Sequence, residues 1–256
     1  MDLGLDGRVY VVSGGSKGLG LATAEALVAE GARVVIVGRT DVDVNAAVAA
    51  LGDKAAGLAA DLGHPATADT AVTLAMDRFG RLDGGLISVG GPPAGTPLTT
   101  TDDQWRSAFE TVFLGSLRLA RALCEGIAAA GTQATGSIAW VLSTSAVEVF
   151  PGLTTSNGLR PGLAMLITDL ADEVGPSGIR VNGLLPGRIA TARLAALDES
   201  TGDAAASRER ASARIPLRRY GEPAEFGRVA AFILSPAASY LSGSLVRVDG
   251  GVTRHP

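Results

Sequence analysis

Short apolar runs rich in Val and Ile alternate along the chain with longer Ala-rich stretches, whose apolar and polar residues follow helical spacing. Runs that are apolar throughout are typical of strands buried on both faces of a parallel sheet. The predicted strands cover residues 8–12, 33–37, 55–60, 84–89, 138–142, 179–184 and 245–248. The predicted helices cover residues 19–30, 41–51, 65–79, 102–130 and 223–234, and one more ends near Val174.

This regular alternation predicts an α/β fold: a doubly wound parallel sheet of about seven strands with right-handed crossovers, in a three-layer αβα sandwich. No linker interrupts the alternation, so residues 1–256 are predicted to form a single domain. The least regular segment, residues 190–216, is expected to be a mobile substrate lid. The basic cluster in and beside it either forms a solvated helix face or attracts an anionic substrate. Its members are Arg208, Arg210, Arg214, Arg218 and Arg219.

The composition narrows the class of protein. Hydrophobic residues make up 46% and charged residues 19% of the 256 positions, which excludes a disordered chain. A net charge of −4 argues against nucleic acid as a partner. We expect a cytoplasmic protein outside the membrane, because no apolar run reaches the roughly 18 residues of a membrane span, the first ten residues lack a secretion signal, and Cys124 is the single cysteine. His64 and His255 lie far apart with no cysteine cluster, so no metal site is predicted.

A glycine-rich loop joins the first predicted strand to the first predicted helix. Residues 13–20 read Ser-Gly-Gly-Ser-Lys-Gly-Leu-Gly, so Gly14, Gly18 and Gly20 have the spacing G-x-x-x-G-x-G. Glycine allows positive φ and lacks the Cβ that would block the approach of a diphosphate. The N-terminus of the following helix offers free N–H groups to that anion. The loop therefore predicts a dinucleotide-binding site.

This spacing resembles the short-chain dehydrogenase/reductase family, and further motifs match that family in order along nearly the whole chain. They are Asp61-Leu62, Phe79-Gly80-Arg81-Leu82-Asp83, Arg180-Val181-Asn182, Pro186-Gly187 with Ile189 and Thr191, residues 218–223, and Val248-Asp249-Gly250-Gly251. The resemblance implies a Rossmann-like fold that binds a nicotinamide dinucleotide, a homodimer or homotetramer, and a segment over residues 180–191 that holds the nicotinamide carboxamide. The positions that we assign to the cofactor are Gly14, Ser16, Lys17, Gly18, Leu19, Gly20, Arg39, Thr40, Asp61, Leu62, Ser88, Val89, Gly90, Arg160, Pro186, Gly187, Ile189 and Thr191.

The end of the second predicted strand discriminates between the two nicotinamide cofactors. An acidic side chain there would bind the free ribose 2′-OH of NAD and repel the 2′-phosphate of NADP. The position is Gly38, followed by Arg39 and Thr40, and Lys17 adds positive charge in the glycine loop. Because arginine can bind a phosphate with two parallel hydrogen bonds, we predict NADP(H) rather than NAD(H). Asp43 lies close by, and both basic residues could instead be ordinary surface charges.

The resemblance also locates the family's catalytic positions, and most of the expected residues are absent. The family uses a Tyr as general acid or base, a Lys four residues later, a Ser that binds the substrate oxygen, and an Asn that supports a water relay. Here Ser143 matches the serine, whereas Ser156, Arg160 and Val112 stand at the Tyr, Lys and Asn positions. A serine hydroxyl is far less acidic than a phenol. Arginine stays charged, so Arg160 can donate hydrogen bonds or stabilise an alkoxide but cannot shuttle protons.

Residues 156–162 read Ser-Asn-Gly-Leu-Arg-Pro-Gly, which is a poor sequence for a helix interior. We expect the helix to begin near Arg160 with Pro161 in its first turn, so that Ser156 and Arg160 would not lie one turn apart. Ser-Asn-x-Leu-Arg and Gly90-Gly91-Pro92-Pro93 nevertheless resemble a divergent branch of the family, which carries this motif in place of Tyr and Lys and is classed with the oxidoreductases. The resemblance suggests a coordinated replacement of the catalytic residues.

Three functions remain open. The first is an NADP(H)-dependent oxidoreductase that reduces a small-molecule ketone or oxidises the corresponding alcohol. Ser143 would hold the carbonyl, Arg160 or Ser156 would polarise it, and water or else Glu148 would supply the proton. The second is a catalytically silent or non-redox NADP(H)-binding protein, such as a sensor or regulator. A lyase, isomerase or cyclase that uses the same pocket is a further alternative.

Overall fold

Seven parallel strands form one sheet in the computed structural model, in the order β3-β2-β1-β4-β5-β6-β7. The structure describes residues 2–91, 94–129 and 136–254. The strands are β1 (Val9–Ser13), β2 (Arg33–Gly38), β3 (Ala55–Ala59), β4 (Gly84–Ile87), β5 (Gly136–Val141), β6 (Ile179–Pro186) and β7 (Leu245–Val248). The predicted doubly wound α/β fold is confirmed, and each predicted strand lies within two residues of its expected bounds.

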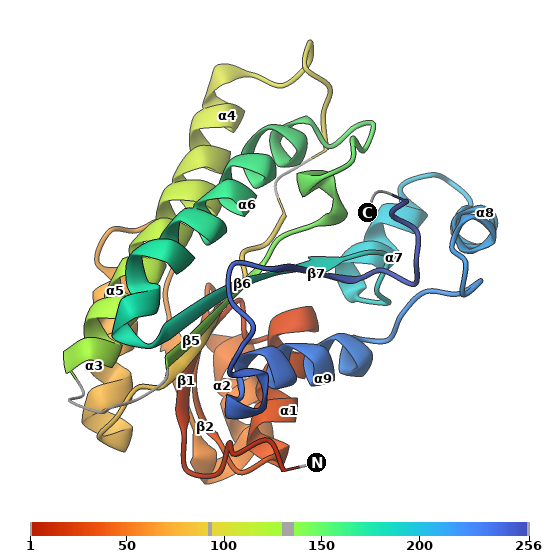
Figure 1. Cartoon of the computed structure of the whole chain (residues 1–256). Coiled ribbons are helices and arrows are strands. Elements are labelled where there is room, and N and C mark those ends of the chain that lie inside the picture. Colours follow the sequence, from red (N-terminus) through yellow and green to blue (C-terminus); the bar gives the residue numbers. More distant parts are fainter. Residues whose placement is uncertain (1, 92–93, 130–135, 255–256) are drawn as a thin grey trace.

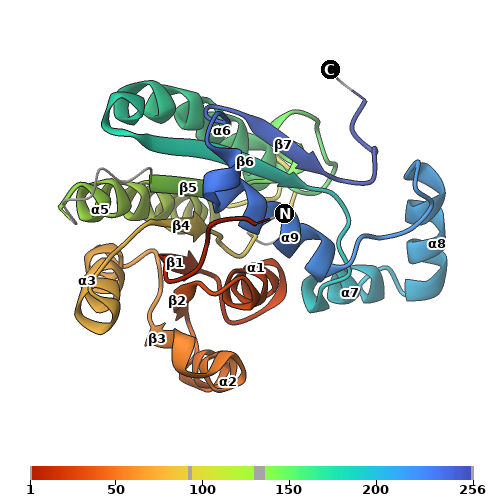
Figure 2. The same cartoon turned by 60° about the horizontal axis from the view of Figure 1, so that its bottom comes forward.

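Helices cover both faces of the sheet and enclose two hydrophobic cores (Figures 1 and 2). They are α1 (Gly18–Ala29), α2 (Asp41–Leu51), α3 (Thr67–Phe79), α4 (Asp102–Ala108), α5 (Gly115–Ala129), α6 (Thr154–Val174), α7 (Ala192–Glu199), α8 (Ala204–Arg214) and α9 (Pro223–Leu234). Side chains alternate along a strand, so Val9 and Val11 of β1 pack beneath α3, α5 and α6, whereas Tyr10 and Val12 pack beneath α1, α2 and α9. Within the described ranges, no helix is long and apolar enough to cross a membrane.

The long helix predicted over residues 102–130 is divided in the structure. α4 is followed by a π-helical turn, Phe109–Leu114, and then by α5. A Cβ at Gly115, where α5 begins, would lie 2.5 Å from the carbonyl oxygen of Leu62, so the helix passes very close to the chain that follows β3. π-Helical turns are frequent at functional sites, and Val112 is buried in this one. Residue 130, the predicted end of the helix, lies outside the described residues.

Helix α6 begins earlier than predicted. It starts at Thr154 and carries Pro161 in its interior rather than in its first turn. The expectation that Ser156 and Arg160 would not lie one turn apart was therefore wrong. They stand on the same face of α6, where Arg160 Nε donates a hydrogen bond to Ser156 Oγ at 3.2 Å.

Contacts with other segments hold the first turns of α6 in helical form. The Asn157 side chain accepts a hydrogen bond from the backbone N–H of Phe150 at 3.1 Å and donates one to its carbonyl oxygen at 2.8 Å, which ties the helix to the preceding loop. A Cβ at Gly158 would lie 2.6 Å from Cη2 of Trp105, so glycine allows α4 to approach this closely. These contacts outweigh the low helix propensity of the segment.

Residues 190–216, expected to be the least regular part of the chain, contain two helices. The side chain of Thr191 caps α7 by accepting from the backbone N–H of Leu194 at 3.3 Å. The side chain of Asp203 caps α8 in the same way, by accepting from Ala206 at 3.0 Å. Both helices lie outside the two layers that cover the sheet (Figures 1 and 2). The predicted mobility of this segment as a lid stays a prediction.

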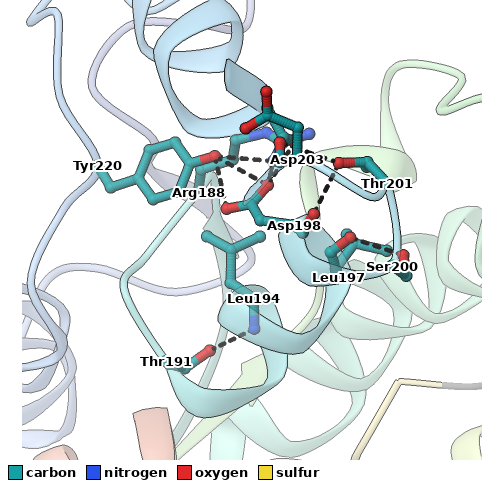
Figure 3. Close-up of polar contacts among 10 residues, drawn as sticks. Arg188, Thr191, Leu194, Leu197, Asp198, Ser200, Thr201, Asp203 and Tyr220 are labelled. Carbon is teal, nitrogen blue, oxygen red and sulfur yellow. Dashed lines mark hydrogen bonds and ion pairs between the residues drawn. The ribbon is translucent and has the colours of Figure 1, made fainter. Parts of the chain in front are cut away.

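A buried carboxylate joins the two helices to the rest of the fold (Figure 3). Asp198 of α7 is 5% exposed and accepts hydrogen bonds from the hydroxyl groups of Ser207 in α8 at 2.8 Å and Tyr220 at 3.0 Å. Arg188, which follows β6, donates to the same carboxylate at 3.3 Å. The guanidinium of Arg208 lies over the Tyr220 ring, 4.9 Å from its centroid. Residues before and after the segment, Arg188 and Tyr220, thus bind the carboxylate of α7.

Candidate active site

A cavity of about 730 Å³ opens at the carboxyl ends of the strands. The ends of β1 and β4 flank it, and the chain leaves these two neighbouring strands toward opposite sides of the sheet. Ligands of doubly wound folds bind in the crevice at such a switch point. Every residue that we assigned to the cofactor from the sequence lines this cavity, and so do Ser143 and Ser156. Their roles stay predictions, but the fold brings all of them to one place.

The glycine loop forms one wall of the cavity and has no room for side chains where it bends. A Cβ at Gly14 would lie 2.7 Å from the carbonyl oxygen of Ser88, and a Cβ at Gly20 would collide with the carbonyl group of Gly14. Gly14 and Gly18 also have positive φ angles of 59° and 56°. Helix α1 begins at Gly18, where its free N–H groups border the cavity. This geometry fits a diphosphate group.

Hydrogen bonds between β1 and β4 hold the opposite wall. Ser13 Oγ accepts from the backbone N–H of Ser88 at 2.9 Å and donates to the Ser88 carbonyl oxygen at 3.0 Å. The chain from Ser88 to Gly91 then runs along the cavity. The buried Ser13 hydroxyl therefore fixes the position of a segment that we assigned to the cofactor.

The end of β2 has no acidic side chain and no space for one. A Cβ at Gly38 would lie 2.7 Å from Ser16 Oγ and 2.9 Å from a methyl group of Val44. Arg39, at the cavity edge, is exposed and has no hydrogen bond or ion pair within the described residues. Lys17, in contrast, is paired with Asp43 at 2.8 Å. Of the two basic residues at this end, Arg39 is therefore the one without a polar partner among the described residues.

A chain of hydroxyl groups and one cation lies at the other end of the cavity. Ser143 Oγ accepts from the backbone N–H of Ser145 at 3.1 Å, which leaves its own proton available for a ligand oxygen. Ser156 Oγ lies 2.8 Å from Ser145 Oγ and accepts from Arg160 Nε at 3.2 Å. Arg160 Nη1 donates to the carbonyl oxygen of Val141, at the end of β5, at 2.9 Å. Two serines and an arginine are therefore aligned beside Ser143.

The charge of Arg160 is buried without a compensating carboxylate. The residue is 6% exposed, and its hydrogen-bond partners are a hydroxyl group and a carbonyl group. Burial, and secondarily the nearby charge of Arg193, lower the pKa of Arg160 to about 10. The guanidinium is still protonated at neutral pH, so Arg160 acts as a fixed cation and hydrogen-bond donor rather than as a base.

The acidic residues that line the cavity, Asp43 and Asp61, lie at the end formed by β2 and β3. Glu148, which we considered as a proton donor, does not line it. Among the described residues, no three His, Cys, Asp or Glu side chains form a group that could hold a metal ion. No acidic side chain of the described residues therefore lines the end of the cavity that carries Ser143 and Ser156.

Two residues of this end were not identified from the sequence. Ser145 links Ser143 to Ser156, but its role depends on the turn Thr144–Ala146, whose shape only the structure reveals. Arg193 reaches the cavity from the first turn of α7. Its position two residues after Thr191, a residue assigned to the cofactor, was the only signal in the sequence.

Some residues singled out in the sequence lie elsewhere. Arg180 and Asn182 do not line the cavity, although the family motif placed them in the segment that holds the carboxamide. Both instead donate to the carbonyl oxygen of Leu241, at 3.1 and 2.8 Å, and thereby support the chain that leads into β7. None of the five arginines considered for attracting an anionic substrate lines the cavity. For example, Arg219 forms an ion pair with Glu225 at 2.6 Å.

Known proteins resemble this chain over nearly its whole length. A family model described as enoyl-(acyl carrier protein) reductase matches residues 14–253. The short-chain reductase protein NovJ of Streptomyces niveus is 32% identical over 247 residues, which are 95% of this chain and 93% of that protein. The crystal structure of L-sorbose reductase from Gluconobacter frateurii, complexed with NADPH and L-sorbose, superimposes with a TM-score of 0.94 at 30% identity and covers 100% of both chains. An NADPH-bound short chain oxidoreductase from Pseudomonas aeruginosa, described as containing an atypical catalytic center, gives a TM-score of 0.89 at 28% identity, covering 97% of this chain and 98% of that one.

Proposed function

The chain belongs to the short-chain dehydrogenase/reductase family and is an oxidoreductase of the carbonyl–alcohol type, and from this premise we propose that it uses NADP(H) to reduce a ketone, or to oxidise the corresponding alcohol, at an atypical catalytic centre. The observation that carries the proposal is the hydrogen bond between Arg160 and Ser156 in the cavity. The two replaced positions act on one another, as expected of a substituted catalytic pair rather than of random loss.

The chemistry can be assigned to the residues of the chain. When bound, the reduced cofactor supplies the hydride for the carbonyl carbon. Ser143 would donate a hydrogen bond to the carbonyl oxygen, and the positive charge of Arg160 would stabilise the negative charge that develops there. The Ser156 hydroxyl would pass a proton to this oxygen, and water would replace that proton through Ser145. Arg160 keeps its charge throughout.

This arrangement predicts a slow enzyme compared with relatives that carry Tyr and Lys. A positioned and tuned general acid contributes about 10²–10⁴ in rate. A serine hydroxyl cannot be tuned to neutral pH as a phenol can. Hydride transfer to a carbonyl polarised by Ser143 and Arg160 remains possible, because electrostatic stabilisation does not require the missing acid.

NADP(H) is the proposed cofactor. Gly38 offers no carboxylate that would repel a 2′-phosphate, and Arg39 is available to bind one. The structures of L-sorbose reductase and of the Pseudomonas oxidoreductase are complexes with NADPH, which supports the same choice here.

A second function is favoured by Val112, which is buried and cannot support a water relay at the Asn position. The protein would then bind NADP(H) without turnover, as a sensor or regulator.

One experiment distinguishes the two functions. Purified protein should be given NADPH and a panel of ketones, quinones and β-ketoacyl thioesters while the absorbance of the reduced cofactor is followed. Turnover that is lost in Ser143→Ala and Arg160→Ala but kept in Arg106→Ala, an exposed control, supports the enzyme. Tight NADPH binding without consumption across the panel supports the silent protein.

Two further features are proposed. Residues 190–216 would move as a lid, since Leu194 and Leu197 of α7 line the cavity. Hydrogen exchange in this segment should then slow when NADPH is added. The chain would also form a homodimer or homotetramer. The apolar side chains of Phe109 and Met165 are 41% and 73% exposed, and a subunit interface would bury them. Light scattering of the purified protein measures that mass directly.

A further inference from the structure

A buried polar network lies behind the wall of the large cavity and has no part in the proposed chemistry (Figure 3). The Tyr220 hydroxyl donates to Asp198 Oδ2 at 3.0 Å and accepts from Arg188 Nη1 at 3.1 Å. The side chains of Asp198 and Tyr220 are buried. None of these three residues lines the cavity of about 730 Å³, whereas their sequence neighbours Ile189 and Leu197 do. The network therefore supports the cavity wall from the outside.

The network joins α7 to residues 187–191, the segment that follows β6. Asp198 belongs to α7, and its partner Arg188 belongs to the segment. The backbone next to the tyrosine pairs with the same segment. Gly221 donates to the carbonyl oxygen of Arg188 at 3.0 Å, and Ala190 donates to the carbonyl oxygen of Gly221 at 2.8 Å. The segment is thus held from behind, and the carboxylate of α7 is bound to the same support.

The first turn of α7 has a cavity on each side. Thr191, Ala192 and Leu194 line the large cavity and also a second cavity of about 290 Å³ behind the helix. Asp198 and Tyr220 line this second cavity as well. A cavity provides no protein atoms for dispersion contacts. The position of the turn therefore depends strongly on the hydrogen bonds of α7.

The supported segments lie on the side of the cavity away from Arg39. In the sheet, β2 and β3 lie on one side of β1, and β4, β5 and β6 lie on the other. The glycine loop after β1 fits the diphosphate, and Arg39 after β2 fits the 2′-phosphate. The nicotinamide half of a dinucleotide lies beyond the diphosphate, so it would extend toward β5 and β6. Thr191, where the segment after β6 ends, comes within 3.5 Å of the position of a Cβ at Gly18 in the glycine loop.

We propose that Asp198, Tyr220 and Arg188 are positioning residues, which hold α7 and residues 187–191 in the arrangement that binds the nicotinamide half of the cofactor. This rests on the proposed binding of NADP(H). Removal of one group from the network should leave α7 correctly placed in only a fraction of the molecules. The apparent dissociation constant of the cofactor then rises by the inverse of that fraction. A ligand without the nicotinamide half does not need α7, so its affinity should stay the same.

The test compares NADPH with adenosine 2′,5′-bisphosphate, which keeps the 2′-phosphate but lacks the nicotinamide half. Calorimetry would measure both ligands in the parent, Tyr220→Phe and Asp198→Asn. Each variant should bind NADPH about tenfold more weakly and should bind the bisphosphate within about twofold of the parent. Two matched controls should bind both ligands as the parent does. They are Tyr240→Phe, at an exposed tyrosine, and Glu199→Gln, at an exposed carboxylate next to Asp198.

Three further measurements separate positioning from a general loss of stability. In Tyr220→Phe, KM for NADPH should rise about tenfold while kcat stays within about threefold, because saturating cofactor restores the arrangement. Amide hydrogen exchange in α7 should be faster than in the parent without cofactor, and saturating NADPH should remove the difference. The double variant Asp198→Asn/Tyr220→Phe should bind NADPH about as weakly as the weaker single variant, since both changes act on one network.

Equal weakening of NADPH and the bisphosphate, or unchanged binding of both, overturns the positioning role. If the parent binds NADH but not NADPH, the proposed cofactor is wrong, and the same comparison made with NADH and AMP decides the positioning role. If NADPH binding changes as expected but no carbonyl compound is reduced, the positioning role stands and the proposed reductase fails. A parent that binds neither dinucleotide overturns both.

Discussion

Two buried charges lie near opposite ends of the central strands β4 and β5 and have different partners. At the amino end of β4, Asp83 is 1% exposed and accepts hydrogen bonds from Arg8 at 3.0 Å, from Arg81 at 2.6 Å and from the backbone N–H of Val9 at 2.8 Å. At the carboxyl end, Arg160 is buried with neutral partners alone. Asp83, which lies outside the cavity, is paired with two arginines. Arg160, which lines the cavity, has no carboxylate partner. Charged groups with perturbed pKa values cluster at functional sites, which fits the position of Arg160 in the cavity.

The tyrosines sharpen the same contrast. Tyr10 is buried in the core, donates to the carbonyl oxygen of Leu234 at 3.2 Å, and has a pKa raised chiefly by burial. Tyr220 donates to Asp198, and burial is the largest cause of its raised pKa (Figure 3). Tyr240 is fully exposed. None of these phenols lines the cavity, so none replaces the missing catalytic tyrosine.

The largest effect is expected when the charge of Arg160 at the cavity is removed. Arg160→Met should lower kcat/KM for a ketone by about 10²–10³, because a donor and a charge aimed at the developing alkoxide are lost. Its free energy of unfolding should stay within about 1 kcal/mol of the parent, since removal of an uncompensated buried charge offsets the lost hydrogen bonds. Steady-state kinetics and urea unfolding measure the two quantities. A fall of several kcal/mol in the free energy of unfolding would show that Arg160 is a structural residue. The contrast with Asp83 would then not hold.

The matching variant at the paired charge, Asp83, should change the free energy of unfolding rather than the activity. Asp83→Asn should lower the free energy of unfolding by about 3 kcal/mol, at the low end for breaking a buried pair because Arg8 and Arg81 are partly exposed. Urea unfolding gives this value, and kcat of the folded variant should hardly change. Asp103→Asn, in an exposed ion pair with Arg106, is the control and should cost less than about 1 kcal/mol. Equal losses in the two variants would contradict the assignment.

The same logic applies to Arg39 and Lys17, the basic residues at the end of the cavity formed by β2 and β3. Arg39→Gln should weaken NADPH binding about tenfold and leave NADH binding unchanged, because an unpaired arginine would lose its phosphate contact. Lys17→Gln should have a smaller effect, since Lys17 is already paired with Asp43. Fluorescence titration of both cofactors tests this. If both cofactors weaken equally in Arg39→Gln, the residue does not read the 2′-phosphate.

The smallest expected effect concerns Cys124, whose thiol lies outside the cavity. Burial raises the pKa of the Cys124 thiol from 9.0 to about 11. For an acid, a raised pKa keeps the neutral form, so the thiolate fraction near pH 8 is about 100-fold lower than for an unperturbed thiol and recovers only as the pH rises toward 11. Alkylation by iodoacetamide, followed by mass spectrometry, should be correspondingly slower in the native protein than in urea. Equal rates would mean that the thiol is accessible and unperturbed.

Much of the cofactor cavity could be predicted because its determinants are local. The bend at Gly14 and the start of α1 at Gly18 are encoded in adjacent residues, and the parallel strands bring their carboxyl ends to one edge whatever the details of packing. The catalytic end depended on contacts between distant segments. Low propensity over residues 156–162 predicted a late helix start, but Trp105 and the loop at Phe150 hold the segment in α6.

The sequence by itself determined the α/β fold and the glycine cradle, since each follows from periodicity or from residues close together in the chain, and its resemblance to the family showed that the usual catalytic Tyr and Lys are absent. Only the tertiary structure decided that Ser156 and Arg160 lie one turn apart, that Ser145 connects them to Ser143, and that Arg193 joins them from α7. The physical reason is that burial and charge compensation depend on which segments meet in space. A local sequence pattern does not show whether a buried cation lies beside an anion.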